Sequence, residues 1–194
     1  MRRTAFVAHA CAAVNAAAAL ALATVLAPGV SLMPTHAHAA YVAEHLVPWR
    51  LGWGLWIAAA LSLLAFFRWW AARIGWSLFT RVAIVLAVVG VLADIGAESR
   101  LIAWSPGQPF ELDGALRLSG LVANGLYSVA GLLLTSRSRG LPRWLVAWSW
   151  LVWLLGIGLA GAAAVSSDDA SRVLTAALFI LFLPWLVVIG RRLA

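Results

Sequence analysis

Two carboxyl side chains lie one helical turn apart in an otherwise apolar stretch, "VLADIGAESRLIAW" (91–104). Asp94 and Glu98 are four residues apart, so on a helix they share one face, and Arg100 follows closely. A charge at the centre of a membrane-spanning helix costs about 2.5–3.5 kcal/mol, and such a side chain normally faces the protein interior and has a partner. The pair therefore indicates an ion or ligand site, or a polar contact between helices.

The next apolar segment, "LRLSGLVANGLYSVAGLLL", contains candidate partners for these acids. Helices joined by a short connection are usually neighbours, and Asn124 comes at a depth similar to that of Asp94. We expect hydrogen bonds among Asp94, Asn124 and Tyr127, with an arginine neutralising Glu98. The expected polar cluster comprises Asp94, Glu98, Asn124, Tyr127, Ser128, Arg100 and Arg117.

This cluster has two interpretations. In the functional one, the acids form a proton or cation site, or the polar end of a ligand pocket that opens outward. In the structural one, the acids hold two helices together through Asn124 and an arginine. Both interpretations predict that Asp94 faces the protein interior and not the lipid.

Histidines gather between the first two apolar segments, at His36, His38 and His45, with Glu44 beside the last. Imidazole and carboxylate groups bind zinc, copper or nickel, so these residues are a candidate metal site. The segment has no expected secondary structure to hold them in place, and a solvated polar loop is the alternative. His9 has no second helix-borne histidine for a haem ligand pair, so the cofactor is unknown.

The composition indicates a membrane protein. Of the 194 residues, 64% are hydrophobic and 11% charged, with a mean hydropathy of +0.95, whereas a soluble domain is about a quarter charged. Runs of about 20 apolar residues cross the bilayer as helices. The sequence therefore predicts an all-α transmembrane bundle of six helices in one domain. The expected spans cover residues 4–26, 51–70, 77–97, 118–134, 144–165 and 173–190.

The first span has a second interpretation. "MRR", an Ala-rich apolar run and "THAHAA" resemble a secretory signal with a cleavage site near Ala37–Ala39. Cleavage would leave five helices. The apolar run is longer than the 7–15 residues of an ordinary signal core, so we expect the helix to be retained.

Arginine placement predicts the orientation, because cytoplasmic loops carry an excess of Lys and Arg. With both termini in the cytoplasm, most of the arginines fall inside. Trp49 and Trp104 then fall near the outer interface and Trp69 and Trp144 near the inner one, as expected for aromatic belts. We expect a multi-pass protein of the cell inner (plasma) membrane. The inner arginines would be Arg2, Arg3, Arg68, Arg73, Arg81, Arg137, Arg139, Arg143, Arg191 and Arg192.

Several protein classes are disfavoured. The net charge of +7 comes from arginines at segment ends and not from a basic groove with interleaved aromatics, so nucleic acid is not an expected partner. Cys11 is the one cysteine of the sequence, so a disulfide within the chain is excluded. No nucleophile–base–orienter set is visible, which leaves an enzyme uncertain and disfavoured. "GIGLAG" (156–161) matches a dinucleotide motif but lies inside a span. Gly156, Ala160 and Ala164 instead predict close helix packing.

Two functional hypotheses follow. The first is a non-enzymatic accessory or structural subunit that acts through helix contacts with a membrane partner or a second copy of itself. The alternative is a small transporter or ion-handling protein that uses Asp94 and Glu98 in an outward-facing polar site. An outward cavity reaching Asp94 distinguishes the alternative from the first hypothesis, which predicts fully paired acids.

Overall fold

The computed structural model describes residues 5–32, 35–108 and 112–194, without the side chains of residues 31–32 and 35–36. The predicted all-α bundle is confirmed: in this part of the chain six helices are long and apolar enough to cross a membrane, and no strand occurs. Of the residues considered above, Arg2, Arg3 and the side chain of His36 lie outside the description.

The elements follow the order of the predicted spans, with short additions between them. Three short segments, η1, η2 and η3, are π-helical. The bounds are α1 (Phe6–Ala21), η1 (Leu22–Leu26), η2 (Pro28–Leu32), α2 (Thr35–Glu44), α3 (Leu46–Ile74), α4 (Leu78–Ala103), α5 (Leu112–Arg117), η3 (Leu118–Ala123), α6 (Asn124–Arg137), α7 (Arg143–Ala164) and α8 (Asp168–Leu193).

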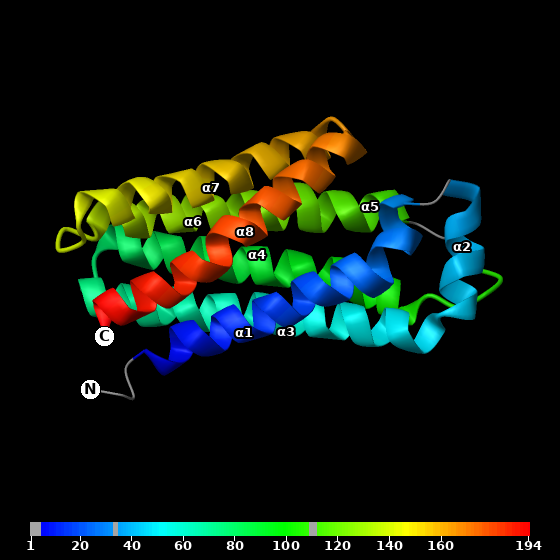
Figure 1. Cartoon of the computed structure of the whole chain (residues 1–194), viewed down its shortest axis with the longest axis horizontal. Helices are drawn as coiled ribbons and strands as arrows, with labels where there is room; N and C mark the ends of the chain where they lie inside the picture. Colours follow the sequence, from blue (N-terminus) through cyan, green and yellow to red (C-terminus); the bar gives the residue numbers. More distant parts are fainter. Residues whose placement is uncertain (1–4, 33–34, 109–111) are drawn as a thin grey trace.

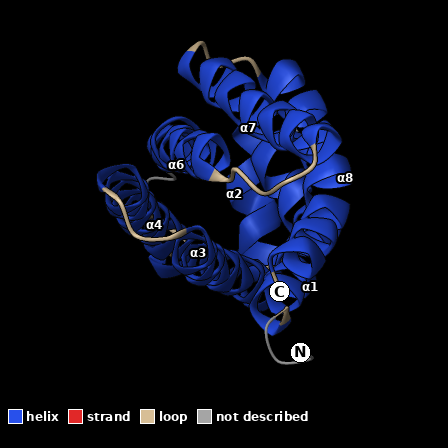
Figure 2. Ribbon diagram, turned by 90° about the vertical axis from the view of Figure 1, so that its left-hand side faces the viewer, coloured by secondary structure: helices blue, strands red, loops and turns tan. Residues whose placement is uncertain are grey.

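The long helices form a ring in chain order. Each of α1, α3, α4, α6, α7 and α8 packs on the next, and α8 returns to pack on α1 (Figure 2). Short connections make sequential helices neighbours, whereas the α8–α1 contact joins the two ends of the sequence. At Gly190 a Cβ atom would overlap the side chain of Ala8, so the absence of a side chain permits this closure.

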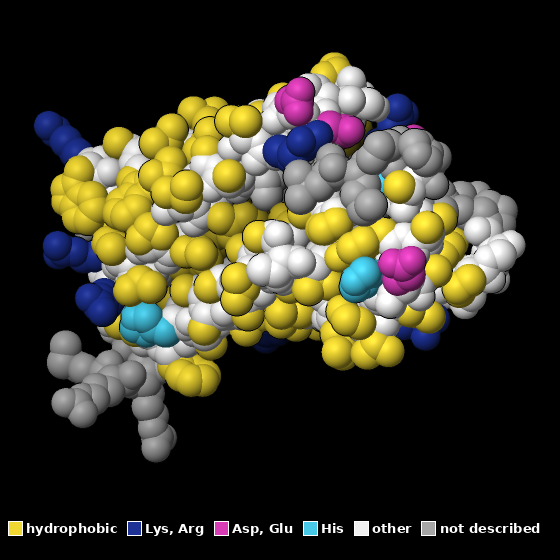
Figure 3. All heavy atoms as spheres, turned by 45° about the vertical axis from the view of Figure 1, so that its right-hand side comes forward, with side chains coloured by type: hydrophobic (Ala, Val, Ile, Leu, Met, Phe, Trp, Pro, Cys, Tyr) yellow, Lys and Arg dark blue, Asp and Glu magenta, His cyan; other side chains and the backbone are white. Residues whose placement is uncertain are grey.

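The bundle has two distinct ends. The start of α1 and the end of α8 lie together at one end, called here the terminal end, and α2 lies at the other, called the α2 end (Figure 1). On the face shown in Figure 3, hydrophobic side chains cover the flank, arginines project at the terminal end, and acidic side chains lie towards the α2 end with further arginines nearby.

The segment between the first two spans differs from the expectation of a loop. It forms α2 because "THAHAAYVAE" is rich in alanine, which has the highest helix propensity. The Tyr41 hydroxyl donates a hydrogen bond to the Val25 carbonyl at 2.9 Å, and the His45 ring stacks on Tyr41 with centroids 4.3 Å apart. The segment is therefore ordered on the bundle end.

The helices also extend beyond the predicted spans. α8 begins at Asp168 and not at residue 173, because the carboxylates of Asp168 and Asp169 are favourable in a first helical turn. α3 begins at Leu46, and Pro48 is tolerated there since it falls in the first turn. Apolar runs mark the part of a helix inside lipid, whereas the helix itself continues past it.

An aromatic cluster fills the ring near the terminal end. Its edge-to-face contacts include Trp153 against Trp185, with ring centroids 5.1 Å apart. The indole N–H groups of Trp153 and Trp185 donate hydrogen bonds to the hydroxyl oxygens of Thr135 and Ser149, at 3.2 and 2.9 Å. These large side chains are therefore buried without leaving their N–H groups unsatisfied. The aromatic cluster comprises Phe66, Phe67, Trp70, Trp153, Phe182 and Trp185.

Candidate functional site

Asp94 is held inside the bundle by two hydroxyl groups. α4 places this side chain on its inner face, where it is 4% exposed. The Ser119 hydroxyl donates a hydrogen bond to Oδ1 at 2.6 Å, and the Tyr127 hydroxyl donates one to Oδ2 at 2.8 Å. Each carboxylate oxygen thus has a donor, and hydrogen bonds between membrane helices are worth about 0.6 kcal/mol on average and about 1.7 kcal/mol at most.

The π-helical segment η3 sets the geometry of this site. In η3 the chain turns more slowly than in an α-helix, so residues five apart lie above one another. The side-chain amide of Asn124 donates a hydrogen bond to the backbone carbonyl of Ser119, five residues earlier, at 3.2 Å. The Ser128 hydroxyl donates to the backbone carbonyl of Asn124 at 2.7 Å. Single π-helical turns are frequent at functional sites, and this one places Ser119 and Asn124 on the same face.

Gly90 makes room for the Tyr127 ring. A Cβ atom at Gly90 would lie 2.7 Å from Cε1 of that ring, closer than non-bonded carbons approach. Gly90 is one helical turn before Asp94, so the phenol lies along α4 and its hydroxyl reaches the carboxylate.

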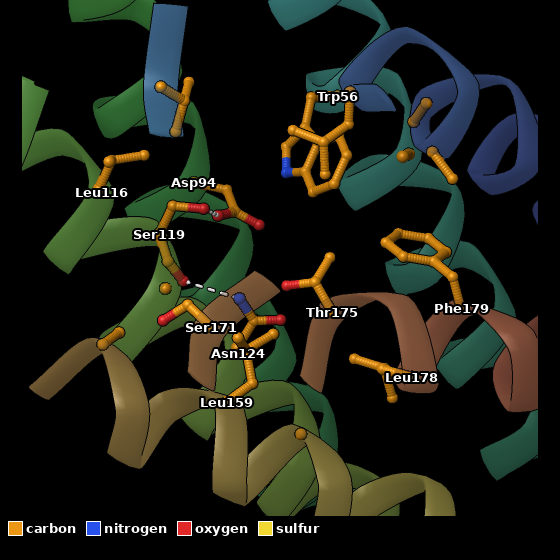
Figure 4. Close-up of a pocket in the computed structure, with 18 of the residues that line it drawn as sticks. Trp56, Asp94, Leu116, Ser119, Asn124, Leu159, Ser171, Thr175, Leu178 and Phe179 are labelled. Carbon is orange, nitrogen blue, oxygen red and sulfur yellow. Dashed lines mark hydrogen bonds between the residues drawn. The ribbon is translucent and has the colours of Figure 1, made fainter. Parts of the chain in front are cut away.

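A cavity of about 690 Å³ lies within the ring, and Asp94 is part of its wall. Ligand pockets occupy about 300–1,000 Å³. Polar side chains lie on one side of it and Trp56, Leu178 and Phe179 on the other (Figure 4). The rings of Trp56 and Phe179 are 5.9 Å apart and join α3 to α8 across the apolar side. The polar side comprises Asp94, Ser119, Asn124, Ser171 and Thr175.

The cavity is closed at one end and open at the other. Trp153 and Phe182 line it and belong to the aromatic cluster, which fills the ring beneath. At the α2 end the lining residues are exposed and charged, so the mouth is there. These residues are Asp113, Arg117, Asp168 and Arg172.

Glu98 is fully buried but unpaired. Its exposure is 0%, and within the described part of the chain neither carboxyl oxygen has a hydrogen-bond partner. The expected neutralisation by an arginine is not observed. Arg100 is exposed, because residues two apart on a helix face different directions, and the Arg117 guanidinium donates instead to the Ser166 hydroxyl at 2.9 Å.

The predicted cluster is thus only partly brought together. Asp94 contacts Tyr127 directly, whereas Asn124 bonds Ser119 and Ser128 bonds Asn124. Ser119 was not predicted as a partner of Asp94, because α-helical spacing does not predict a π-helical turn. Ser171 and Thr175 were not predicted either, although their spacing of four residues on α8 is a signal that could have identified them.

The histidines do not form a described metal site. His38 is buried, and the His45 Nδ1 atom hydrogen-bonds the Tyr41 carbonyl at 2.9 Å, while Glu44 is exposed. Across the described residues no group of three or more His, Cys, Asp or Glu side chains could hold a metal ion. Because the side chain of His36 lies outside the description, the metal hypothesis stays a prediction.

The small residues of α7 face the neighbouring helix in part. A Cβ atom at Gly156 would overlap the Ser128 hydroxyl, and one at Gly125 would lie 3.7 Å from the Ala160 methyl group. Ala164 is exposed. The close approach of α7 to α6 therefore involves Gly156 and Ala160 and lies within this chain.

Comparison with protein-family models, with curated proteins and with solved structures finds nothing that matches the chain. The geometry of the cavity and its wall is therefore the basis for a functional proposal.

The hydroxyl donors of Asp94 generate the first prediction. We expect Tyr127→Phe and Ser119→Ala each to lower the unfolding free energy by roughly 0.6–1.7 kcal/mol, the range for buried hydrogen bonds between membrane helices. Thermal unfolding in lipid nanodiscs measures this. Ser136→Ala is the control, because the exposed Ser136 hydroxyl bonds only the Leu133 carbonyl of its own helix. A Tyr127→Phe variant as stable as the control contradicts the geometry.

Glu98 generates the second prediction. If this carboxyl group held two helices together, its removal would destabilise the protein. Because it is buried without a partner, we expect Glu98→Met, of similar size and apolar, to leave the unfolding free energy unchanged or to raise it. Thermal unfolding in lipid nanodiscs measures this change as well. A loss of stability in Glu98→Met as large as that in Tyr127→Phe would assign Glu98 a structural role.

Proposed function

We propose that the chain is a small transporter of the inner (plasma) membrane, and that its solute binds in the cavity with Asp94 as the binding carboxylate. The observation that carries this proposal is the cavity itself, about 690 Å³ in volume with a hydrogen-bonded carboxylate in its wall. An accessory subunit that works through its outer surface needs no such interior. The unpaired Glu98 also argues against acids that act only to join helices.

The direction of opening follows from the arginines. At the terminal end, Arg68 and Arg73 lie in the last turns of α3, Arg137 is the last residue of α6 and Arg139 lies in the connection to α7. An excess of arginine marks the cytoplasmic side. The mouth at the α2 end then faces outward, and the aromatic cluster closes the inner side. Under this proposal, the cavity is open to the outer side and closed to the inner side.

α8 is the helix best suited to move between states. It contributes Ser171 and Thr175 to the polar side of the cavity and Phe182 and Trp185 to the aromatic cluster. Pro184 lies between these two aromatic residues. Proline has no N–H for the helical hydrogen bond and weakens the helix locally, so α8 can bend where the inner closure has to open.

Cysteine labelling in proteoliposomes of known orientation tests this proposal. Cys11 is buried, and its replacement by serine gives a background without thiols. We expect Thr175→Cys to react with a membrane-impermeant cationic thiosulfonate from the outer side. Ser149→Cys, under Trp185 in the aromatic cluster, should react only from the inner side and slowly, when the closure opens.

Leu145→Cys is the companion variant of Ser149→Cys. It lies one turn earlier on α7, nearer the terminal end, and is equally buried. An opening that exposes Ser149 to the inner side should therefore expose Leu145→Cys from that side as well, and neither variant should react from the outer side. A Ser149→Cys variant that is never labelled from the inside contradicts transport. It would favour the accessory-subunit hypothesis, in which the interior stays closed.

A further inference from the structure

We infer that the solute is an amphiphilic organic cation, with its positive, hydrogen-bond-donating end at Asp94 and Asn124 and its apolar body against Trp56 and Phe179. This inference rests on the proposed function and names the class of molecule that the cavity takes. Its basis is the two-sided wall of the cavity and the balance of donors and acceptors on the polar side (Figure 4).

Most donors on the polar side are already used within the protein. The hydroxyl hydrogens of Ser119 and Tyr127 are directed to Asp94, and that of Ser128 to the Asn124 carbonyl. The Asn124 amide nitrogen donates to the Ser119 carbonyl. An ionised carboxylate offers about four acceptor positions, so Asp94 keeps unused ones, as does the side-chain oxygen of Asn124. Around Asp94 and Asn124 the wall therefore offers mainly acceptors, which suit a donor-rich ligand group, and the nearby hydroxyl groups of Ser171 and Thr175 can either donate or accept.

The charge inside the cavity also favours a cationic ligand. Among the described residues no arginine forms an ion pair with Asp94. The two arginines of the lining are at the mouth, where Arg117 bonds Ser166 and Arg172 pairs with Asp169 at 3.5 Å. A buried charge without a counter-charge is costly. A cationic ligand group supplies that counter-charge, whereas an anionic one would add a second negative charge.

The size and the apolar side exclude a bare ion as the best-fitting ligand. A calcium ion takes 6–8 oxygen ligands at about 2.3–2.6 Å. Among the described residues, no group of three or more acidic, histidine or cysteine side chains could hold a metal ion. The rings of Trp56 and Phe179 instead offer an aromatic surface against which an apolar body can pack. A cavity of about 690 Å³ fits a drug-sized molecule.

The opening also suits a molecule that partitions into lipid. Ala23 of η1 and Ala176 of α8 line the cavity and are exposed. They lie on η1 and α8, so at these two residues the lining of the cavity reaches the outer surface of the bundle. An amphiphile can enter there from the outer leaflet as well as from water.

Three probes with one apolar body test the inference: 4-phenylbutylamine, 4-phenylbutanol and 4-phenylbutyrate, which are cationic, neutral and anionic near neutral pH. Isothermal titration calorimetry with the full chain in nanodiscs of neutral lipid measures the dissociation constants, and empty nanodiscs correct for partition. We expect the amine to bind at least about tenfold more tightly than the alcohol, because charged hydrogen bonds are stronger than neutral ones. The acid should not bind saturably.

Variants show whether the preference for the amine over the alcohol arises at Asp94. Asp94→Asn should lower the affinity for the amine to that for the alcohol and leave the alcohol unchanged. Asp169→Asn is the matched control, because this carboxylate is 93% exposed at the start of α8, and it should keep the preference. Thr175→Phe, which fills the cavity between its polar and apolar sides, should abolish saturable binding.

Three results would overturn the inference. The first is that the acid or the alcohol binds as tightly as the amine and that Thr175→Phe abolishes this binding. In that case the cavity remains a solute site and the proposed function stands. The second is a preference for the amine that survives Asp94→Asn. The third is that none of the probes binds saturably, and transport is then judged separately by the labelling of Ser149→Cys.

Discussion

The structure depends on keeping one carboxylate, Asp94, inside a bundle made of apolar helices. Removing a charged group from water is costly unless hydrogen bonds replace the lost solvation. Ser119 and Tyr127 supply these bonds at 2.6 and 2.8 Å. Both come from the chain segment packed on α4, so the requirement of Asp94 fixes how this segment turns and where it lies. The π-helical η3 and the bare face of Gly90 are the local consequences.

The cavity follows from the same arrangement together with closure of the ring. α8 crosses the ring obliquely (Figure 1): near the terminal end it contributes to the aromatic cluster, and near the α2 end Ser171 and Thr175 line open space. The bundle thus combines a well-packed half with a hollow half. A polytopic protein that only stabilised a partner would gain from filling the hollow half, because empty space inside a core forfeits contacts. The persistence of the space supports a ligand.

The sequence predicts the helices well and their mutual contacts poorly. Apolar runs identify all six spans, since lipid leaves the backbone no alternative. The depth of Asp94 and Tyr127 along adjacent spans indicates that they meet. Two features could not be read in this way. Ser119 reaches Asp94 through a π-helical turn, and α8 meets α1 across the whole chain. Both depend on local rotation or long-range packing, which periodicity alone does not determine. The exposure of Arg100, in contrast, follows from its spacing of two residues from Glu98.

The central claim is that Asp94 receives the positive end of the solute. Infrared difference spectroscopy of the full chain in nanodiscs, before and after addition of 4-phenylbutylamine, observes that side chain directly. The account predicts a change in the carboxyl stretching bands that is absent from Asp94→Asn and retained in Asp169→Asn. Binding of the amine with no change in these bands, or with a change that persists in Asp94→Asn, would contradict it.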